Sequence, residues 1–461
     1  MPPIIPLILC IIFVLWLLSL DRKRNSAASF ALWLPIIWLL LIAGKPLGVW
    51  FPTGRSEMEI GSPYDRYFIT ALLILGILVL FKRRFAFSKA IKENIWLIFL
   101  IGYMLISTLW SSMFAVSLTR WIREMPALIM AFIVLSEGNP REAMLSVLRR
   151  TTYILIPFSL ILVKYFPQYG VQFGRWSGEL MWVGVCTQKN GLGRLCLIAA
   201  FFLIWSLIRG WIEPNSPRVK YQTSAEICLL VITAFLLNGP NISGRSATAI
   251  TSLSVGLTAF IELIFLKKFK VYLNANILMS IIAAIFIFGI LMVFTAGSTV
   301  SSLTSTMGRE ETLTGRTDVW KMLLPVAMQH PLLGHGFGGF WTSATRQYFD
   351  ISEAHNGYLD MLLETGFAGL TLVMFFLLSS CRRAQRIMKD DFYWSILWIC
   401  FLIMAVVHNI SESSINALAS HLTAILIFLA VSSTSNTLTT EIPVNKTKQF
   451  SAQKYFRMTG R

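Results

Sequence analysis

The segment from Gly315 to Gly369 gathers side chains that can bind anions and transfer protons. In chain order it contains Arg316, His335, His355, Asn356 and Glu364, set among several glycines. Arginine binds phosphate oxygens through paired N–H donors, and histidine is the side chain best able to take a proton near neutral pH. These residue types in one segment indicate proton transfer beside a bound phosphate group.

His355 is the residue that we expect to act as the general base. It stands next to Asn356 and just before an apolar run, with Glu364 about two helical turns further along. A neutral imidazole at this place could deprotonate an acceptor hydroxyl. We therefore interpret His355, Arg316 and Glu364 as candidate catalytic residues and Asn356 as a candidate loop or acceptor contact.

His335 lies between two glycines, Gly334 and Gly336. The backbone freedom of glycine suits a binding turn, so His335 is a candidate loop or acceptor residue. A hydrogen-bonded loop histidine without a binding role fits the same pattern equally well. Both interpretations stay open from the sequence.

Three further basic residues are candidates for holding a diphosphate. Lys189 opens one apolar run, Arg245 precedes another, and Arg175 lies in the polar segment before Lys189. The N–H groups and dipole at the start of a helix favour an anion. Taken singly, each cation also suits a side chain that snorkels to lipid headgroups.

The pattern predicts neither a metal site nor a cofactor. The chain has no Asp-x-Asp or His-x-x-x-His motif, and His355 and Glu364 are not at a tight ligand spacing. The 6 cysteines are scattered without a Cys-x-x-Cys pair, which argues against a zinc site or a structural disulfide. If a diphosphate leaves, Arg and Lys could neutralise its charge in place of Mg²⁺.

The elements that must position these residues are membrane helices. The chain has 461 residues, 55% hydrophobic and 14% charged, whereas a soluble protein has about 25% charged residues. With roughly 20 apolar residues per crossing, we expect an all-α polytopic integral membrane protein of about 12–13 transmembrane helices. The expected spans are Ile4–Leu20, Ala27–Gly44, Tyr67–Phe81, Ile95–Trp110, Leu118–Leu135, Val147–Val163, Leu192–Leu207, Ser224–Leu237, Ala247–Leu266, Ala275–Phe294, Tyr358–Leu378, Tyr393–Val407 and Leu418–Val431.

The connecting segments alternate in charge. Nearly all of the net +17 falls on one set of connections together with the C-terminal tail. The positive-inside rule makes that face cytoplasmic, and the basic charge indicates topology and attraction to anionic lipid rather than nucleic-acid binding. The candidate site residues then lie on the outer face.

Three regions follow from this topology. We expect N-terminal transmembrane helices over residues 1–163, a catalytic membrane domain over 164–433 and a basic cytoplasmic tail over 434–461. The catalytic domain contains a large outer loop over 297–356. Within this loop the apolar spacing predicts a short amphipathic helix from Thr317 to Gln329, ended by Pro331.

The order of the motifs resembles the O-antigen ligase/polymerase (Wzy/WaaL-type) family. The motifs are Gly315-Arg316-x-x-x-Trp320, Pro331-Leu-x-Gly-x-Gly-Phe-Gly338, His355-Asn-x-Tyr-Leu359 and Glu364-x-Gly-x-x-Gly369. The likeness runs from about Tyr165 to Ser414 and includes Asn409-Ile-Ser-Glu412-Ser. Phe340-Trp341 and His355 to Asp360 look most like the exopolysaccharide polymerase branch.

This resemblance implies a GT-C-like fold and a metal-independent, inverting glycosyltransferase in the bacterial inner membrane. Such an enzyme transfers an undecaprenyl-diphosphate-linked oligosaccharide to a glycan or lipid A-core acceptor on the periplasmic side. Carried over by motif, Arg175 and Arg245 would hold the diphosphate, His355 would activate the acceptor, and Arg316 would anchor the loop or bind phosphate. Other polysaccharide export or assembly proteins would be partners.

Several alternatives stay open from the sequence. A polymerase that joins exopolysaccharide or O-antigen repeat units is the leading interpretation, and an O-antigen ligase acting on lipid A-core is the first alternative. A protein-glycosylating relative would share the motifs. A polysaccharide or lipid transporter is disfavoured, because transporters place ionisable residues near the bilayer midplane and here the polar residues gather outside the spans.

Overall fold

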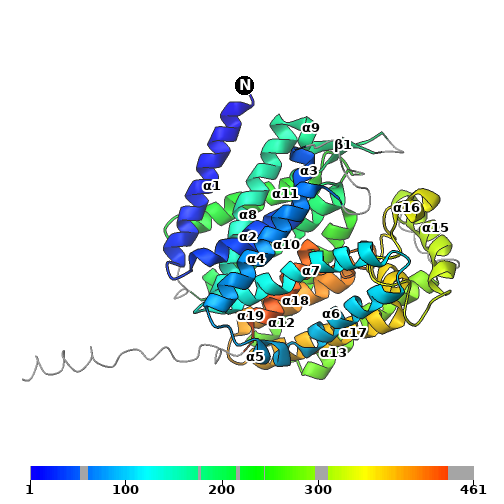
Figure 1. Cartoon of the computed structure of the whole chain (residues 1–461). Helices are drawn as coiled ribbons and strands as arrows, with labels where there is room; N and C mark the ends of the chain where they lie inside the picture. The colour runs from blue at the N-terminus through cyan, green and yellow to red at the C-terminus, as the bar shows by residue number, and fades with distance from the viewer. Residues whose placement is uncertain are drawn as a thin grey trace, which may run out of the picture.

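The computed structural model describes residues 2–51, 61–174, 178–213, 219–242, 244–271, 273–295 and 310–434. Arg175, the Ser/Thr-rich start of the expected outer loop and the basic tail from Lys446 to Arg461 lie outside these ranges. The described chain is almost wholly helical (Figure 1). The expected all-α polytopic membrane fold is therefore confirmed.

The N-terminal part is a series of apolar helices joined by short connections. Ser62 and Asn139 cap two of them by accepting hydrogen bonds from Tyr64 N and Glu142 N, which is the usual device at a helix start. The helices are α1 (Ile4–Arg24), η1 (Phe30–Leu32), α2 (Trp33–Ala43), α3 (Leu47–Trp50), α4 (Pro63–Lys82), α5 (Phe87–Glu93), α6 (Ile95–Ser107), η2 (Thr108–Trp110), α7 (Phe114–Leu135), α8 (Pro140–Tyr165) and α9 (Pro167–Gly170).

The C-terminal part begins with a small antiparallel hairpin, β1 (Val171–Phe173) with β2 (Leu180–Trp182), in which Gln172 pairs with Met181. The helices that follow are α10 (Lys189–Ile212), α11 (Gln222–Asn238), α12 (Ala247–Lys268), α13 (Ala275–Phe294), α15 (Glu310–Ala327), α16 (Ser343–Phe349), α17 (Gly357–Ile387), α18 (Phe392–His408) and α19 (His421–Ser432). α17 is kinked at Gly366, whose φ of 64° is in the region that favours glycine.

Each expected span coincides with a helix of the structure. Among the described residues, 7 helices are long and apolar enough to cross a bilayer, or up to 8 if the pair Phe87–Glu93 and Ile95–Trp110, bent by 94°, forms one span. Four further expected spans are shorter apolar helices: Phe30–Ala43, Gln222–Asn238, Phe392–His408 and His421–Ser432. The expected span that ends at Leu135 lies in α7, whose first half carries Arg120, Arg123 and Glu124.

Two local features differ from the expectations. The helix expected from Thr317 begins earlier, because α15 spans Glu310–Ala327 and ends before Gln329. Its first turns are polar in sequence, so hydrophobic spacing does not reveal them. Periodicity also does not predict the β1–β2 hairpin, since its strands are 3 residues each and too short for a repeating pattern.

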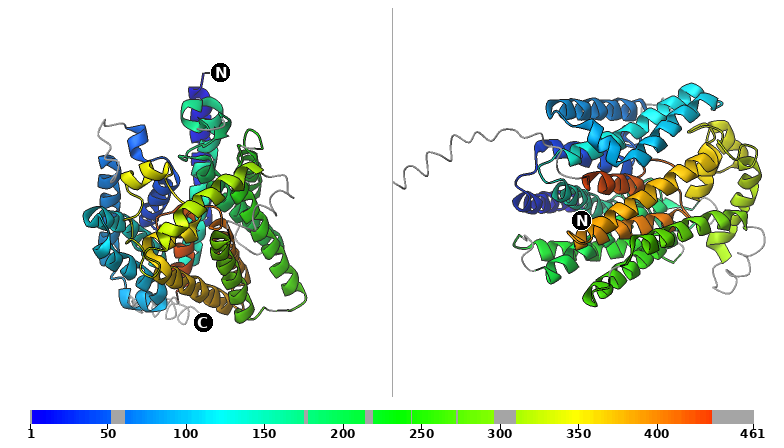
Figure 2. Two further views of the ribbon diagram at one scale, coloured as in Figure 1. Left: turned by 90° about the vertical axis from the view of Figure 1, so that its right-hand side faces the viewer. Right: turned by 90° about the horizontal axis from the view of Figure 1, so that it is seen from below.

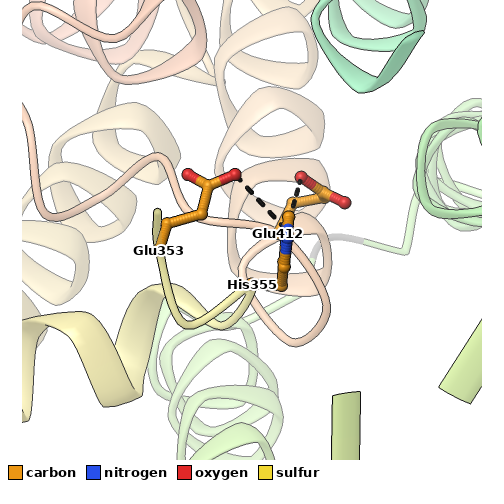
Figure 3. A group of neighbouring side chains, drawn as sticks. All are labelled: Glu353, His355 and Glu412. Atoms are coloured by element: carbon orange, nitrogen blue, oxygen red, sulfur yellow. Dashed lines mark ion pairs between the residues drawn. The ribbon is translucent and has the colours of Figure 1, made fainter. Parts of the chain in front are cut away.

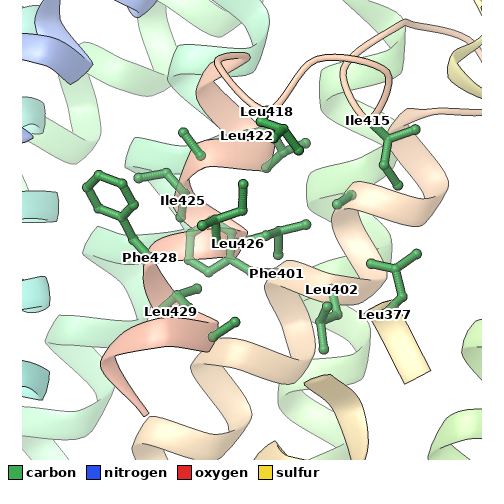
Figure 4. Packing of buried hydrophobic residues seen from close by; sticks show 14 of the residues in the cluster. Leu377, Phe401, Leu402, Ile415, Leu418, Leu422, Ile425, Leu426, Phe428 and Leu429 are labelled. Carbon is green, nitrogen blue, oxygen red and sulfur yellow. The ribbon is translucent and has the colours of Figure 1, made fainter. Parts of the chain in front are cut away.

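The core is built around α18 and α19 (Figure 4). Every residue of α19 is buried, and α18 is buried except for Phe392 and Val407. By contrast, α1, α4, α12 and α13 keep most of their apolar side chains on the outer surface. A helix that is apolar and buried all round belongs inside the bundle, whereas the exposed apolar faces suit contact with lipid.

α17 runs through the middle of the bundle and connects its two sides. Seen from below, its yellow-to-orange ribbon lies between the blue helices and the green pair α12–α13 (Figure 2). It packs against α6 on one side and against α13 and α18 on the other. The first residues of α17 therefore reach the place where several helix ends meet.

Arg149 and Arg150 of α8 belong to a buried ion network. Arg149 Nε lies 2.7 Å from Asp21 Oδ1, and Arg150 Nε lies 2.6 Å from Asp21 Oδ2. Arg149 also contacts Glu142 at 2.7 Å. A charge is tolerated in such an interior only when it is paired, so this network joins the end of α1 to α8.

Candidate functional site

Three ionisable side chains meet at the start of α17. His355 Nδ1 lies 3.3 Å from Glu353 Oε1 and 3.9 Å from Glu412 Oε2 (Figure 3). Glu353 and His355 come from the loop before α17, whereas Glu412 comes from the loop between α18 and α19. The group therefore joins two segments that are distant in the sequence.

The backbone at His355 is held in an uncommon conformation. Its φ is 51°, in the left-handed region that only a few per cent of residues other than glycine adopt. The next residue, Asn356, caps α17, because its Oδ1 accepts hydrogen bonds from the N–H groups of Tyr358 and Leu359, both at 3.0 Å. His355 is thus fixed at a sharp turn directly before the helix.

Asn356 and Gly357 also attach this turn to the loop that carries Glu412. Asn356 Nδ2 donates to the carbonyl of Ile410 at 2.9 Å, and Gly357 N donates to the carbonyl of Asn409 at 2.9 Å. A Cβ on Gly357 would collide with Asn409 Oδ1, so only glycine allows this approach. The candidate role of Asn356 as a loop residue therefore has a structural basis.

Arg316 and Asn190 bind the other side of Glu412. Arg316 Nη2 lies 2.6 Å from Glu412 Oε1, and Asn190 Nδ2 donates to the same oxygen at 2.5 Å. Arg316 Nη1 lies 3.5 Å from the hydroxyl of Thr248. Through Glu412, residues of α15, α10 and α12 converge on the turn that carries His355.

The charges around His355 set its protonation. Burial alone would lower the pKa of His355, but the nearby negative charges of Glu412 and Glu353 outweigh it and raise the pKa above 6.5. Burial would raise the pKa of Glu412, yet His355 and the Arg316 guanidinium hold it below 4.5. Glu412 is 1% exposed, so it is a buried carboxylate that stays charged beside the imidazole.

Lys189 and Arg245 lie at neighbouring helix starts. Lys189 is the first residue of α10 and is electrostatically coupled to Arg316 and Glu412. Arg245 directly precedes Ser246, the N-cap of α12, and is half-buried. The two helices touch there, since a Cβ on Gly193 would collide with the side chain of Ser246. Of the three residues expected to hold a diphosphate, these two are described, and the charge of Lys189 interacts with that of Glu412.

Glu364 and His335 belong to a different neighbourhood. Glu364 lies seven residues into α17, about 10 Å along the helix axis from its start. It accepts a hydrogen bond from the backbone of Gly338 and lies near Arg120. His335 Nδ1 lies 3.0 Å from the carbonyl of Leu363. The structure therefore places Glu364 with the Gly-rich turn and not with His355.

Asp360 connects the two neighbourhoods. Its Oδ1 accepts hydrogen bonds from Trp341 Nε1 at 2.8 Å and from Ala354 N at 3.2 Å. Its other oxygen accepts a hydrogen bond from Ser413. Asp360 is fully buried, so it fixes the residue before His355 and the residue after Glu412 at the same time.

Two comparisons with known proteins show what the chain is similar to. A family model described as O-antigen ligase matches residues 228–374. The chain is also 21% identical over 309 residues to the exopolysaccharide production protein ExoQ of Rhizobium meliloti (strain 1021), a match that covers 64% of this chain and 67% of the relative. Both matches support the resemblance to the O-antigen ligase/polymerase family that the motifs indicate.

The match to the O-antigen ligase model includes Arg245, Arg316, His335, His355 and Glu364. It ends before Glu412, which the sequence places in a motif without assigning it to the site. Sequence reasoning also misses Glu353, because a glutamate in a polar loop carries no signal of its own. The sequence feature that could have identified Glu412 is its position as an acidic residue shortly after a long apolar run.

Glu353, His355 and Glu412 also satisfy the geometry of a metal-ligand set. Each offers one ligand atom, and these atoms lie within 4.8 Å of one another. However, Glu412 already contacts the Arg316 guanidinium at 2.6 Å, and a fixed positive charge at that distance repels a cation. We interpret the three residues as an acid–base group.

Proposed function

We propose that this protein is a membrane glycosyltransferase that transfers an undecaprenyl-diphosphate-linked glycan to a hydroxyl of an acceptor sugar. In this proposal the enzyme polymerises exopolysaccharide or O-antigen repeat units at the periplasmic face of the bacterial inner membrane. The observation that carries it is the joint placement of His355 and Arg316 around the buried carboxylate of Glu412. This arrangement places a candidate base and a cation that can bind phosphate beside the same carboxylate.

In the proposed reaction His355 takes the proton of the acceptor hydroxyl. Its Nδ1 faces Glu353 and Glu412, so the proton on Nδ1 is held toward the carboxylates and Nε2 keeps its lone pair for the acceptor. The side chain is 30% exposed, which allows a substrate to reach it. The two carboxylates then stabilise the imidazolium that forms.

The acceptor oxygen attacks the anomeric carbon of the donor sugar as the bond from that carbon to the diphosphate oxygen breaks. The bonding electrons leave with the diphosphate, and the attack from the opposite side inverts the anomeric configuration. Lys189 and Arg245 lie at helix starts, where backbone N–H groups add to their charge. In this proposal they neutralise the leaving diphosphate in place of Mg²⁺, with Arg175 as a further donor-side residue.

The proposed location follows from charge and chemistry together. The basic connections favour a cytoplasmic side for the ends of α1, α4 and α8 that carry them, and the His355 turn is then assigned to the opposite side. An undecaprenyl-linked glycan is available to an enzyme at that face, within the bilayer. The donor, the acceptor glycan and the surrounding lipid would then be the partners of the protein.

An O-antigen ligase is the second candidate, because the family model that matches residues 228–374 is described by that activity. Deletion of the gene followed by glycan analysis separates the two. Loss of free high-molecular-weight polysaccharide supports the polymerase. Accumulated lipid-linked polymer with bare lipid A-core supports the ligase. Unchanged glycans in the deletion strain would contradict both.

A further inference from the structure

A cavity of about 780 Å³ lies beside the Gly-rich turn, apart from the group around His355. Two segments form it: the connection between η2 and α7, and the stretch 329–345. Its polar and aromatic lining includes Trp110, Ser112, His330, His335, Phe340 and Thr345. A cavity of this size can hold a ligand of several rings. The proposed proton transfer does not involve this cavity.

The chemistry of the lining indicates the class of ligand. Beside the apolar side chains of Pro331, Leu332 and Leu333, the described lining has aromatic rings, imidazoles and hydroxyls. It contains no lysine, arginine, aspartate or glutamate. A diphosphate needs cations, and a lipid tail needs no hydrogen-bonding groups. Flat aromatic faces that receive the C–H face of a sugar ring, together with neutral donors and acceptors for its hydroxyls, fit a carbohydrate.

His335 is prepared for such hydrogen bonding. Its backbone N–H and its Nδ1 both contact the carbonyl of Leu363, at 2.9 Å and 3.0 Å, so Nδ1 carries the ring proton. Burial lowers the pKa of His335 below 6.5, which keeps the ring neutral. Nε2 is then an acceptor for a sugar hydroxyl.

The aromatic residues complete the arrangement. The Phe340 ring lies 5.2 Å from the His335 ring, which in turn lies 4.8 Å from the His330 ring at 84°. Trp110 is 38% exposed, so part of its ring is open to a ligand. A half-exposed tryptophan at the mouth of a polar cavity offers a stacking surface.

The cavity wall is joined to the His355 turn through a short chain of contacts. Phe340 precedes Trp341, which donates to Asp360, and Asp360 accepts from the N–H of Ala354 beside His355. Lys189, at the start of α10, interacts electrostatically with Glu412 beside that turn. The cavity lining contains neither Lys189 nor Arg245, the described cations expected to hold the donor.

We propose that this cavity binds a part of the acceptor glycan that lies away from the hydroxyl that His355 deprotonates. The inference rests on the proposed glycosyl transfer and assigns its acceptor subsite. It predicts that changes in the cavity raise KM for the acceptor, whereas changes at His355 lower kcat.

The test uses the full-length protein in lipid nanodiscs. The probe is the repeat-unit oligosaccharide released by mild acid from the lipid-linked intermediates of the deletion strain, and calorimetry measures its binding. We expect His335→Ala and Trp110→Ala each to weaken binding by about tenfold, the loss that corresponds to one neutral hydrogen bond or one stacking contact. His355→Asn should bind the probe as the wild type does. Absence of binding to the wild type, or unchanged affinity in both cavity variants, would overturn the inference.

A labelling experiment covers the case in which the cavity variants fold poorly. Ser112 lines the cavity and is exposed, so Ser112→Cys in a Cys228→Ser background can carry a bulky maleimide. Labelling should raise the acceptor KM by about tenfold relative to the same unlabelled variant, since the label fills space that the glycan needs. The control is Gln347→Cys, exposed on α16 and outside the cavity lining, where labelling should leave KM unchanged. Equal effects at both positions would overturn the inference, while full activity of His355→Asn would refute the proposed function itself.

Discussion

Glu412 Oε2 lies 3.9 Å from His355 Nδ1, although one residue precedes α17 and the other follows α18. The other oxygen of Glu412 is bound by Arg316 at 2.6 Å. One buried carboxylate therefore faces a base on one side and a cation on the other. The charge of Glu412 therefore acts on both His355 and Arg316.

The first prediction concerns pH. His355 must be neutral to accept a proton, and Glu412 and Glu353 raise its pKa above 6.5, so activity should rise with pH through that raised value. Glu353→Gln removes one supporting charge and should move this acidic limb to lower pH. The pH profile of kcat/KM measures the shift. Asp350→Asn makes the same charge change on the same loop and should leave the limb in place. An unmoved limb in Glu353→Gln would contradict the role of Glu353.

The second prediction concerns the stability that Arg316 provides. Arg316→Met leaves the buried Glu412 without its guanidinium, and breaking a buried pair in this way costs about 3 kcal/mol. Arg316→Lys keeps the charge and should lose less. Thermal unfolding in nanodiscs compares the two variants with the wild type. Equal unfolding temperatures for the methionine and lysine substitutions would show that charge is not the stabilising factor.

The same pair has a dependence on pH. Because the pKa of Glu412 is lowered in the folded protein, its stabilising contribution is present above its unfolded value and is lost as pH falls through the folded value. In Arg316→Met the carboxyl can take up a proton as pH falls. The destabilisation relative to wild type should therefore shrink in acid, and a difference that is constant with pH would contradict this account.

The third prediction concerns Asp360. Asp360→Ala removes the acceptor of Trp341 Nε1 and of Ala354 N, and each buried donor left unpaired costs about 1–3 kcal/mol. Both the unfolding temperature and kcat should fall, since the turn at His355 loses its support. Asp390→Ala, at an exposed position after α17, is the matched control. A wild-type kcat in Asp360→Ala would contradict the claim that Asp360 supports the His355 turn.

The fourth prediction concerns topology. Ser343 begins α16 and Lys389 follows α17, and the charge pattern assigns them to opposite faces. Reporter fusions that are active on one side of the membrane should therefore give opposite signals at the two positions. The same signal at both would overturn the assignment of the His355 turn to the periplasmic side.

The helices could be predicted from the sequence because each apolar run excludes water along a whole helix. The bounds of polar elements could not be predicted in this way. For example, α15 starts several residues before Val319 and Leu323, the residues whose spacing indicates a helix. The β1–β2 hairpin depends on local pairing of short segments. Apolar periodicity thus locates the bundle and misses the parts of the outer segments that are held by hydrogen bonds.

The site could be predicted in part. Type and neighbours identify Arg316 and His355, and the structure brings both to Glu412. Glu412 itself arrives through the packing of α18 against α17, a long-range relationship that one sequence does not reveal. Helical spacing predicts Glu364 near His355, but its neighbours are Gly338 and Arg120. Spacing along one helix cannot tell which loops cover its faces.

The most direct test of the central claim is the turnover of His355→Asn with lipid-linked repeat units in nanodiscs. Asparagine tolerates the φ of 51° at this position but cannot act as a base near neutral pH. If His355 takes the acceptor proton, kcat should fall about 10²–10⁴-fold while the unfolding temperature and oligosaccharide affinity stay at wild-type values. Wild-type turnover in His355→Asn would contradict the account.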